Sequence, residues 1–184
     1  GDLCFKKFKD FPREEYDFII NCTGIGTPNK LKDSPASVFS ITEEFDNMVL
    51  DYLFRFTQSR YINFSSGAVY GQSFTGAIND NSTYSLQVNN IKPEQYYGIA
   101  KINSEAKHRA HKNLNIVDIR VFAYFSRFID LNAGYFLTDL IKSIQENKEF
   151  MTNSYDFIRD YIHPQDLFSL VGSIIENSPF NGTV

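Results

Sequence analysis

The chain has 184 residues, of which 42% are hydrophobic and 22% are charged, and its formal net charge is -4. This length and composition are typical of one folded domain with a sizeable core, and they argue against a disordered chain. The negative charge and the lack of a long Lys and Arg run argue against a surface for nucleic acid or anionic membranes.

The cysteines and the hydropathy pattern exclude further classes of protein. Cys4 and Cys22 are the only cysteines, which is too few for a disulfide framework, and they lack the paired spacing of a zinc site. No apolar run reaches the ~18 residues that a membrane span needs, and the sequence begins at Gly1 with neither a signal peptide nor Met. We therefore expect a cytoplasmic protein with no metal and no membrane partner, and we expect more chain before Gly1.

Strands and helices are expected to alternate along the chain. Residues 16–23 (YDFIINCT) form a nearly unbroken apolar run, which is typical of a strand buried on both faces of a parallel sheet. Apolar residues then recur at helical spacing from Ile41 to Phe56. The pattern continues with a strand at 61–65, a loop at 71–90, a helix at 96–113, a strand at 115–124, and helices at 136–147 and 164–176.

This alternation predicts an α/β fold built from βα units, with helices on both faces of a doubly wound parallel sheet. In such sheets ligands bind beyond the carboxyl ends of the strands. Functional residues are therefore expected just after Thr23, Ser65 and Tyr124.

Tyr97 and Lys101 are a candidate acid/base pair. They stand four residues apart at the start of a predicted helix, so both side chains project from one face, about one turn apart. A phenol with a pKa near ~10 is a poor base at neutral pH, and a fixed positive charge beside it lowers that pKa. Helices also present such a pair by chance, so the spacing alone is weak evidence.

Ser65 and Ser66 lie at the carboxyl end of the strand that precedes this helix. A hydroxyl there can hydrogen-bond a substrate oxygen beside the phenol, whereas the simpler interpretation is a pair of serines that begin a turn. In this order and spacing, the serines and the Tyr-Lys pair resemble the extended short-chain dehydrogenase/reductase family, also called the NAD-dependent epimerase/dehydratase family.

Four further segments extend the resemblance over essentially the whole chain. Residues 21–26 (NCTGIG) resemble the family's strand end and the small residues beside its cofactor. Residues 119–122 (IRVF) resemble the strand after the catalytic helix, and residues 159–167 (RDYIHPQDL) resemble the substrate-domain motif with its Arg. Residues 1–3 (GDL) resemble the segment whose Asp-hydrophobic pair contacts adenine.

The resemblance implies roles for the matching residues. Tyr97 is expected to be the general acid/base, Lys101 to lower its pKa and bind the nicotinamide ribose, and Ser66, in preference to Ser65, to bind the reacting sugar hydroxyl or carbonyl. The cofactor, NAD or NADP, is expected to contact Asp2, Leu3, Cys22, Thr23, Gly24, Tyr97, Lys101 and Phe122.

Arg159 is expected to pair with the diphosphate of a nucleotide-sugar substrate, because its guanidinium can donate two parallel hydrogen bonds. The alternative for Arg159 is a surface ion pair with Asp156 or Asp160.

The resemblance also predicts the organisation of the chain. Residues 1–125 would be a partial NAD(P)-binding domain with a Rossmann-like sheet that lacks its N-terminal strands, and residues 126–184 would be part of a small substrate-binding region. The family's glycine-rich turn has no counterpart here, so a βαβ unit of at least ~30 residues is expected before Gly1. A homodimer through the helices around Phe45 and Ile102 would follow the family's common mode.

Some positions depart from the family pattern. Ala123 stands where an Asn that contacts the sugar nucleotide is usual. The family also carries an Asn that supports the active site from the helix before the serine strand. Ser40 matches the position of that Asn in spacing, and Asn47 matches it in residue type. Gly67 and Ala68 occupy the place of the acid pair of dehydratases, which favours an epimerase or a reductase.

The three histidines have no predicted catalytic role. His163 is expected to cap or pack the last helix, and His108 and His111 are expected to be solvated on a helix face rich in Lys and Arg. The predicted function is thus an NAD(P)-dependent nucleotide-sugar epimerase or reductase. The alternatives are a reductase of a non-sugar carbonyl and a catalytically silent dinucleotide-binding or scaffold protein.

Overall fold

A parallel sheet of four strands forms the centre of the computed structural model, which describes residues 8–71, 77–154 and 159–184. The strands lie side by side in chain order, and each neighbouring pair is parallel. Their bounds are β1 Phe18–Asn21, β2 Arg60–Ser66, β3 Asn115–Val121 and β4 Gly182–Thr183.

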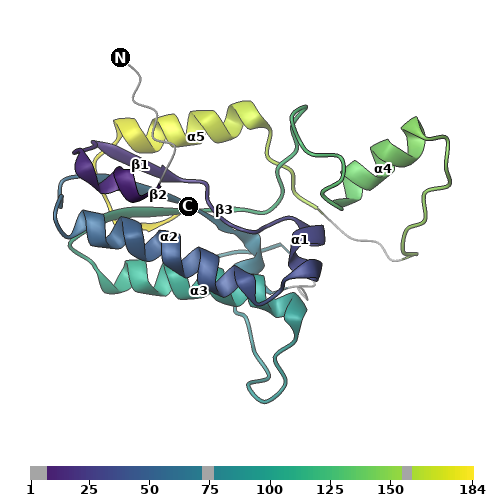
Figure 1. The fold of residues 1–184 in the computed structure, drawn as a ribbon, viewed down its shortest axis with the longest axis horizontal. Coiled ribbons are helices and arrows are strands. Elements are labelled where there is room, and N and C mark those ends of the chain that lie inside the picture. Colours follow the sequence, from purple (N-terminus) through teal and green to yellow (C-terminus); the bar gives the residue numbers. More distant parts are fainter. Residues whose placement is uncertain (1–7, 72–76, 155–158) are drawn as a thin grey trace.

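Helices cover both faces of the sheet (Figure 1). α2 (Ser37–Leu53) and α3 (Pro93–Ala110) lie on one face, and α5 (Pro164–Glu176) lies on the other. α4 (Phe136–Gln145) lies away from these layers. The shorter elements are η1 Phe8–Arg13, α1 Pro28–Asp33 and η2 Gly67–Tyr70. The predicted Rossmann-like, doubly wound α/β fold is therefore confirmed, and none of the described helices is both long and apolar enough to cross a bilayer.

Successive residues of β2 and β3 belong to different halves of the core. Tyr61 and Ile116 pack with α2, whereas Ile62 and Val117 pack beneath Ile174 of α5. Neighbouring side chains of a strand point to opposite faces, and here both faces are covered. This explains the unbroken apolar runs from which the strands were predicted.

Two details differ from the sequence-based expectations. α3 begins at Pro93, three residues before the expected start, because proline is well suited to the first turn of a helix. Part of the range 126–184 belongs to the sheet layers themselves. There α5 packs on the sheet, and Gly182 of β4 pairs with Val117 of β3.

The prediction that His108 is solvated is wrong. Its side chain is completely buried, with Nε2 2.7 Å from Oδ1 of Asp46 and Nδ1 2.8 Å from Oδ1 of Asp118. Burial by itself would lower the pKa of His108, but the hydrogen bonds to Asp118 and Asp46 outweigh it and raise the pKa to about 9. The neighbouring Lys107 and Arg109 made this helix face look exposed, whereas the two carboxylates come from other elements, Asp46 from α2 and Asp118 from β3.

Of the other two histidines, His111 is half-buried and His163 is exposed. The edge of the His111 ring contacts Phe54, with 4.9 Å between the ring centroids, so this residue is less solvated than expected. Nδ1 of His163 accepts a hydrogen bond from the backbone N of Gln165 at 3.2 Å and caps α5. The capping role predicted for His163 is confirmed.

Candidate active site

Two glycines allow α3 to approach the turns that follow β1 and β2. A Cβ on Gly98 of α3 would lie 2.4 Å from the carbonyl oxygen of Ala68, which excludes any side chain there. A Cβ on Gly26 would lie 3.3 Å from the hydroxyl of Tyr97. Tyr97 is therefore packed between the ends of two parallel strands, where ligands bind in this class of sheet.

Ser66 and Tyr97 form the centre of the candidate site. Ser66 ends β2, and its Oγ accepts a hydrogen bond from the backbone N of Ala68 at 3.2 Å. Burial raises the pKa of the Tyr97 phenol above its usual value, and this effect outweighs the side-chain hydrogen bond with Ser66, which lowers the pKa. The phenol is therefore protonated at neutral pH in the structure.

Lys101 lies one turn beyond Tyr97 and is buried. Its Nζ donates a hydrogen bond to the carbonyl oxygen of Phe64 at 2.7 Å and lies 5.9 Å from the centroid of the Tyr97 ring. The expectation that Lys101 lowers the pKa of Tyr97 stays a prediction, since burial is the largest influence on the phenol here and raises its pKa. Burial also lowers the pKa of Lys101, against the effects of Asp46, Asp118 and Glu105.

The two serines at the end of β2 have different partners. Ser65 donates a hydrogen bond to Oε1 of Glu105 at 2.5 Å within the buried interior, whereas Ser66 acts on Tyr97 and lowers the pKa of its phenol. Since consecutive side chains of a strand alternate in direction, only one of the two can face the phenol. The structure places Ser66 there.

The segment expected to line the cofactor begins at the end of β1. Oδ1 of Asn21 accepts a hydrogen bond from the backbone N of Thr23 at 2.9 Å, which shapes the turn. Thr23 is half-buried, and Cys22 and Gly24 are exposed. These three residues lead directly into Gly26, beside the phenol.

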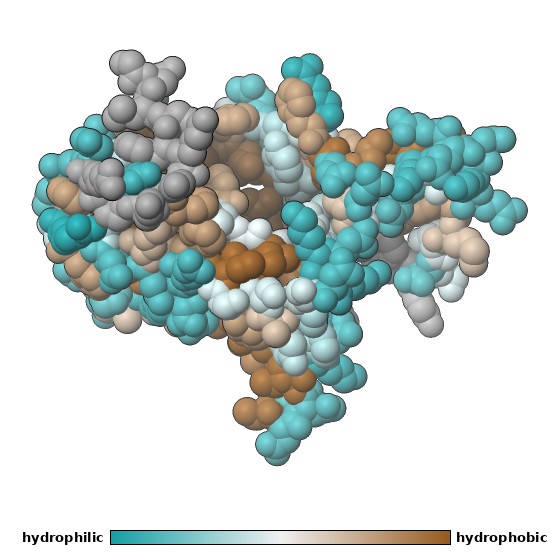
Figure 2. Space-filling view, in the orientation of Figure 1, coloured by the Kyte–Doolittle hydropathy of each residue, from teal (hydrophilic) through white to brown (hydrophobic). Residues whose placement is uncertain are grey.

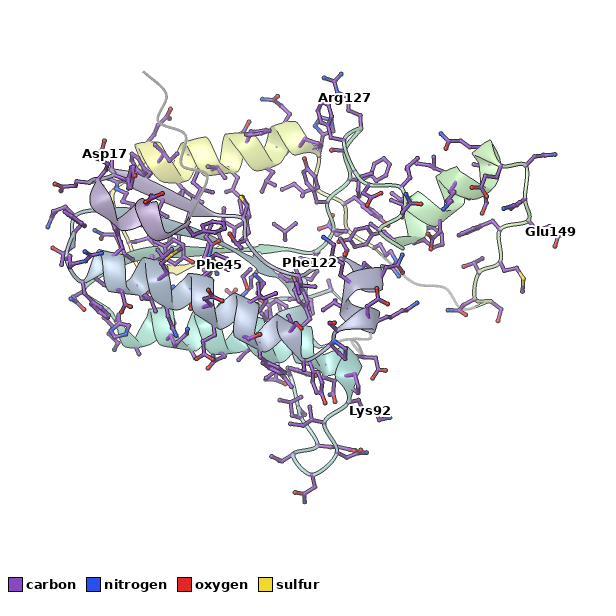
Figure 3. The ribbon with its side chains drawn as sticks, in the orientation of Figure 1. Asp17, Phe45, Lys92, Phe122, Arg127 and Glu149 are labelled. Carbon is purple, nitrogen blue, oxygen red and sulfur yellow. The ribbon has the colours of Figure 1, made fainter. Side chains whose placement is uncertain are left out.

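The remaining expected cofactor residues have different settings. Phe122 is 43% exposed and stacks on Tyr70, with the ring centroids 6.0 Å apart. It lies near the middle of the molecule, in front of the strand ends (Figure 3). A Cβ on Gly67 would lie 2.4 Å from the Phe122 ring, so this glycine provides space for it. Asp2 and Leu3 lie outside the described residues.

Arg159 belongs to a segment that runs beside the continuation of β3. Tyr124 and Ile162 form a parallel bridge, and the backbone N of Ile162 donates to the carbonyl oxygen of Ala123 at 2.9 Å. Arg159 is exposed, and its Cζ lies 5.9 Å from the centroid of the Phe136 ring. Asp156, one alternative partner of Arg159, lies outside the described residues.

Tyr135 is a residue of this region that the sequence did not reveal. Its hydroxyl donates to the carbonyl oxygen of Gly26 at 3.1 Å, and its proximity raises the pKa of Tyr97. Next to it, the side chain of Asn29 donates to the carbonyl oxygen of Asn132 at 2.7 Å. The turn after β1 is thus joined to a segment more than 100 positions away in the chain, which no local pattern could indicate.

Neither candidate for the supporting Asn lies at this site. Ser40 is exposed and donates a hydrogen bond to the carbonyl oxygen of Ser37, one turn earlier in α2. Asn47 is exposed and accepts a hydrogen bond from Nζ of Lys107 at 2.7 Å. Both side chains are occupied on the surface of the helical layer.

The surface around the strand ends is partly apolar. Figure 2 shows hydrophobic side chains near the middle of the molecule, with hydrophilic ones on either side. Exposed aromatic residues follow β3 and flank α4: Phe122, Tyr124, Phe128, Tyr135 and Tyr161. Within residues 8–71, 77–154 and 159–184, no cluster of three or more His, Cys, Asp or Glu side chains could hold a metal ion. The chemical groups of the site are therefore a phenol, a hydroxyl and an ammonium.

The architecture is that of the Rossmann-like α/β class. The model of the NAD dependent epimerase/dehydratase family matches residues 1–182, almost the entire sequence. The chain therefore belongs to the NAD dependent epimerase/dehydratase family. The predicted resemblance is confirmed, as is the expectation of a nicotinamide cofactor for the family. None of the curated proteins matches the sequence.

Solved structures share the fold at low sequence identity. UDP-N-acetylglucosamine 4-epimerase from Methanobrevibacter ruminantium, in complex with UDP-N-acetylmuramic acid, has a TM-score of 0.79 at 16% identity over 97% of this chain and 57% of its own. UDP-glucose 4-epimerase from Thermotoga maritima, with UDP-glucose, has a TM-score of 0.74 at 14% identity over 91% of this chain and 54% of its own. RMD from Pseudomonas aeruginosa, complexed with NADPH, has a TM-score of 0.69 at 16% identity over 91% and 58%.

The chain thus spans little more than half the length of these structures.

Proposed function

We propose that this chain carries the proton-transfer centre of an NAD(P)-dependent epimerase or reductase that acts on a nucleotide-linked sugar. The observation that carries the proposal is the placement of the Tyr97 phenol, which packs against Gly26 at the carboxyl ends of β1 and β2 and lies close enough to Ser66 for that hydroxyl to lower its pKa. Lys101, on the same face of α3, completes a Ser-Tyr-Lys group.

The described residues fit a nicotinamide cofactor at this place. Gly26 leaves open the space that a Cβ would fill beside the phenol, and Lys101 supplies a buried ammonium one turn away. Cys22, Thr23, Gly24 and Phe122, together with Asp2 and Leu3, would line the cofactor, and Lys101 would hold its ribose. When bound, the cofactor supplies hydride acceptance and donation at a sugar carbon.

The protein's own part is proton transfer. In the oxidative direction, Tyr97 Oη takes the proton of the sugar hydroxyl while the hydride leaves the attached carbon. In the reductive direction, the same atom returns the proton to the carbonyl oxygen. Ser66 orients that oxygen by hydrogen bonding. The raised pKa of Tyr97 suits the proton-donating form, so the base form depends on a nearby positive charge when ligands are bound.

Arg159 is the proposed partner of the substrate's diphosphate, since its guanidinium is exposed on the segment anchored beside β3. Gly67 and Ala68 begin η2, where dehydratases of the family carry acidic residues, so an epimerase or a reductase is favoured over a dehydratase. A cytoplasmic location and a homodimer through α2 and α3 remain predictions.

The test compares Tyr97→Phe with Tyr96→Phe. Tyr96 is the preceding residue of the same helix and packs on Phe39, with 5.4 Å between the ring centroids. Turnover of a panel of UDP-, dTDP-, GDP- and ADP-sugars would be measured with NAD and NADP by cofactor absorbance and product analysis. We expect Tyr97→Phe to lose at least about 100-fold in kcat and Tyr96→Phe to keep most of it.

The alternatives give different results in the same assay. Equal turnover of the wild type and Tyr97→Phe would contradict the assigned acid/base. Cofactor binding without turnover of any substrate would indicate a dinucleotide-binding or scaffold protein. Turnover of simple carbonyl compounds alone would indicate a non-sugar reductase.

A further inference from the structure

An ion pair between Glu105, which is buried, and Arg120, whose side chain is 25% exposed, joins α3 to β3 one turn beyond Lys101. Nε and Nη2 of Arg120 donate to both carboxylate oxygens of Glu105, and the shortest of these bonds is 2.6 Å, from Nη2 to Oε2. Such a two-pronged arrangement fixes the relative orientation of its partners as well as attracting them. Neither residue has a role in the proposed proton transfer.

Two further hydrogen bonds extend the pair to the elements that carry Ser66. Ser65 of β2 donates to Oε1 of Glu105 at 2.5 Å, and Nη1 of Arg120 donates to the hydroxyl of Tyr70 at 2.6 Å. Tyr70 is the last residue of η2, the short helix that begins immediately after Ser66. One connected set of side chains therefore spans β2, η2, α3 and β3.

The contacts follow a strict register between α3 and the sheet. Lys101 and Glu105, one turn apart on α3, bind the consecutive residues Phe64 and Ser65 of β2. Arg120, which donates hydrogen bonds to both carboxylate oxygens of Glu105, is the direct neighbour of Ser65 in the β2–β3 pairing. Ser66 is the next residue of β2, and its hydroxyl lowers the pKa of the Tyr97 phenol of α3.

Stability alone is a weak reason for such an arrangement. Taking two charges out of water costs free energy, and replacing buried ion pairs by apolar side chains is often neutral or stabilising. Accurate placement is a different matter, because a displacement of about 1 Å near reacting atoms can cost roughly 100-fold in rate.

We propose that Glu105 and Arg120 are positioning residues, which hold α3, β2 and η2 in the register that sets Ser66 against Tyr97. Their effect on catalysis rests on the proposed function, whereas their effect on the geometry of the site does not.

The geometry is tested by NMR on the 184-residue chain. The reporter is the nuclear Overhauser cross-peak between the Tyr97 ring and Ser66 Hβ, assigned with the Tyr97→Phe variant. We expect the cross-peak to be lost in Glu105→Gln and weakened in Tyr70→Phe, which removes only the hydrogen bond to Arg120. The control is Glu146→Gln, which makes the same substitution in the exposed ion pair of Glu146 with Lys148 and should leave the cross-peak unchanged.

The kinetic arm separates placement from folding. We expect Glu105→Gln to lower kcat by about 100-fold while KM changes by less than about threefold. A double variant, Glu105→Leu with Arg120→Met, replaces the ion pair by apolar groups and should regain stability against urea. If the pair positions the site, kcat of this double variant stays low; if the pair is merely structural, kcat recovers with stability.

The two proposals fail in distinguishable ways. A cross-peak of wild-type intensity in folded Glu105→Gln would overturn the positioning role. If Glu105→Gln does not fold, a cross-peak of wild-type intensity in Tyr70→Phe would overturn it instead. A wild type that turns over no nucleotide sugar would overturn the proposed function, and the NMR comparison would still decide the role of Glu105 and Arg120.

Discussion

Nδ1 of His108 lies 2.8 Å from Oδ1 of Asp118, and neither side chain reaches solvent. The other ring nitrogen lies 2.7 Å from Oδ1 of Asp46 in α2, so one imidazole joins both helices of this layer to the sheet. Lys107 and Arg109 add cations, at 2.7 Å from Asp46 and Asp118 respectively. An imidazole between two carboxylates favours its charged form, which makes this cluster sensitive to pH.

The first prediction concerns stability in alkaline solution. The pKa of His108 is about 9 in the folded protein, against an ordinary value of 6.5. Protonated His108 therefore stabilises the fold fully below pH 6.5, and this contribution declines as the pH rises toward 9 and is then lost. The loss should approach about 3 kcal/mol.

Urea unfolding across this pH range would test the prediction. The free energy of unfolding of the wild type should fall between pH 6.5 and 9, and His108→Gln should flatten that slope. His111→Gln, which changes a half-buried histidine outside the cluster, should keep the slope. An equal slope in the wild type and His108→Gln would mean that His108 is not charged in the folded state.

The second prediction concerns the close approach of α3 to the turn after β2. Gly98→Ala would place a Cβ 2.4 Å from the carbonyl oxygen of Ala68, so the helix must shift. Overpacking of this kind costs about 1–3 kcal/mol, and the shift should also lower activity by moving Tyr97. The matched control is Gly172→Ala in α5, where no atom lies within 4 Å. That variant should gain up to about 1 kcal/mol, since alanine favours helix. Thermal unfolding of both variants measures the difference.

The third prediction concerns the pKa of Tyr97, on which two neighbours act in opposite directions. Ser66→Ala removes the hydrogen bond that lowers this pKa, so the pKa should rise further. Tyr135→Phe removes the phenol whose proximity raises it, so the pKa should fall toward 10. NMR titration of the tyrosine Cζ carbons gives both values, and Tyr96→Phe controls for general effects. Shifts of the same sign in the two variants would contradict the described geometry.

The fourth prediction concerns Asn181, which precedes β4. Its side-chain N donates to the carbonyl oxygens of His108, His111 and Leu114, at 3.2, 3.0 and 2.9 Å, around the end of α3. Asn181→Ala should cost about 2 kcal/mol, because it removes the hydrogen bonds that tie this residue to the end of α3, although the carbonyl oxygens of His108 and His111 keep backbone partners. Asn177→Ala removes an exposed side chain that bonds only to Ser173, and it should cost less. Urea unfolding gives the loss of stability of each variant. A larger loss in Asn177→Ala than in Asn181→Ala would contradict the prediction.

Much of the architecture was predictable because it depends on local periodicity. Apolar runs flanked by turn residues located β1, β2 and β3, since strands covered on both faces carry mostly apolar side chains. The four-residue spacing of Tyr97 and Lys101 was enough to place both on one helix face. The role of Ser66 in binding the sugar oxygen stays a prediction.

The charged contacts were decided by tertiary structure alone. His108 meets Asp46 from 62 positions away, Ser65 meets Glu105 from 40, and Tyr135 meets Gly26 from 109. None of these pairs has a local signature, because the register between α3, α2 and the sheet brings them together. The pKa of Tyr97 shows the same division. Sequence spacing identified the neighbouring ammonium, but the burial that raises the pKa of the phenol exists only once α3 has packed against the turns after β1 and β2.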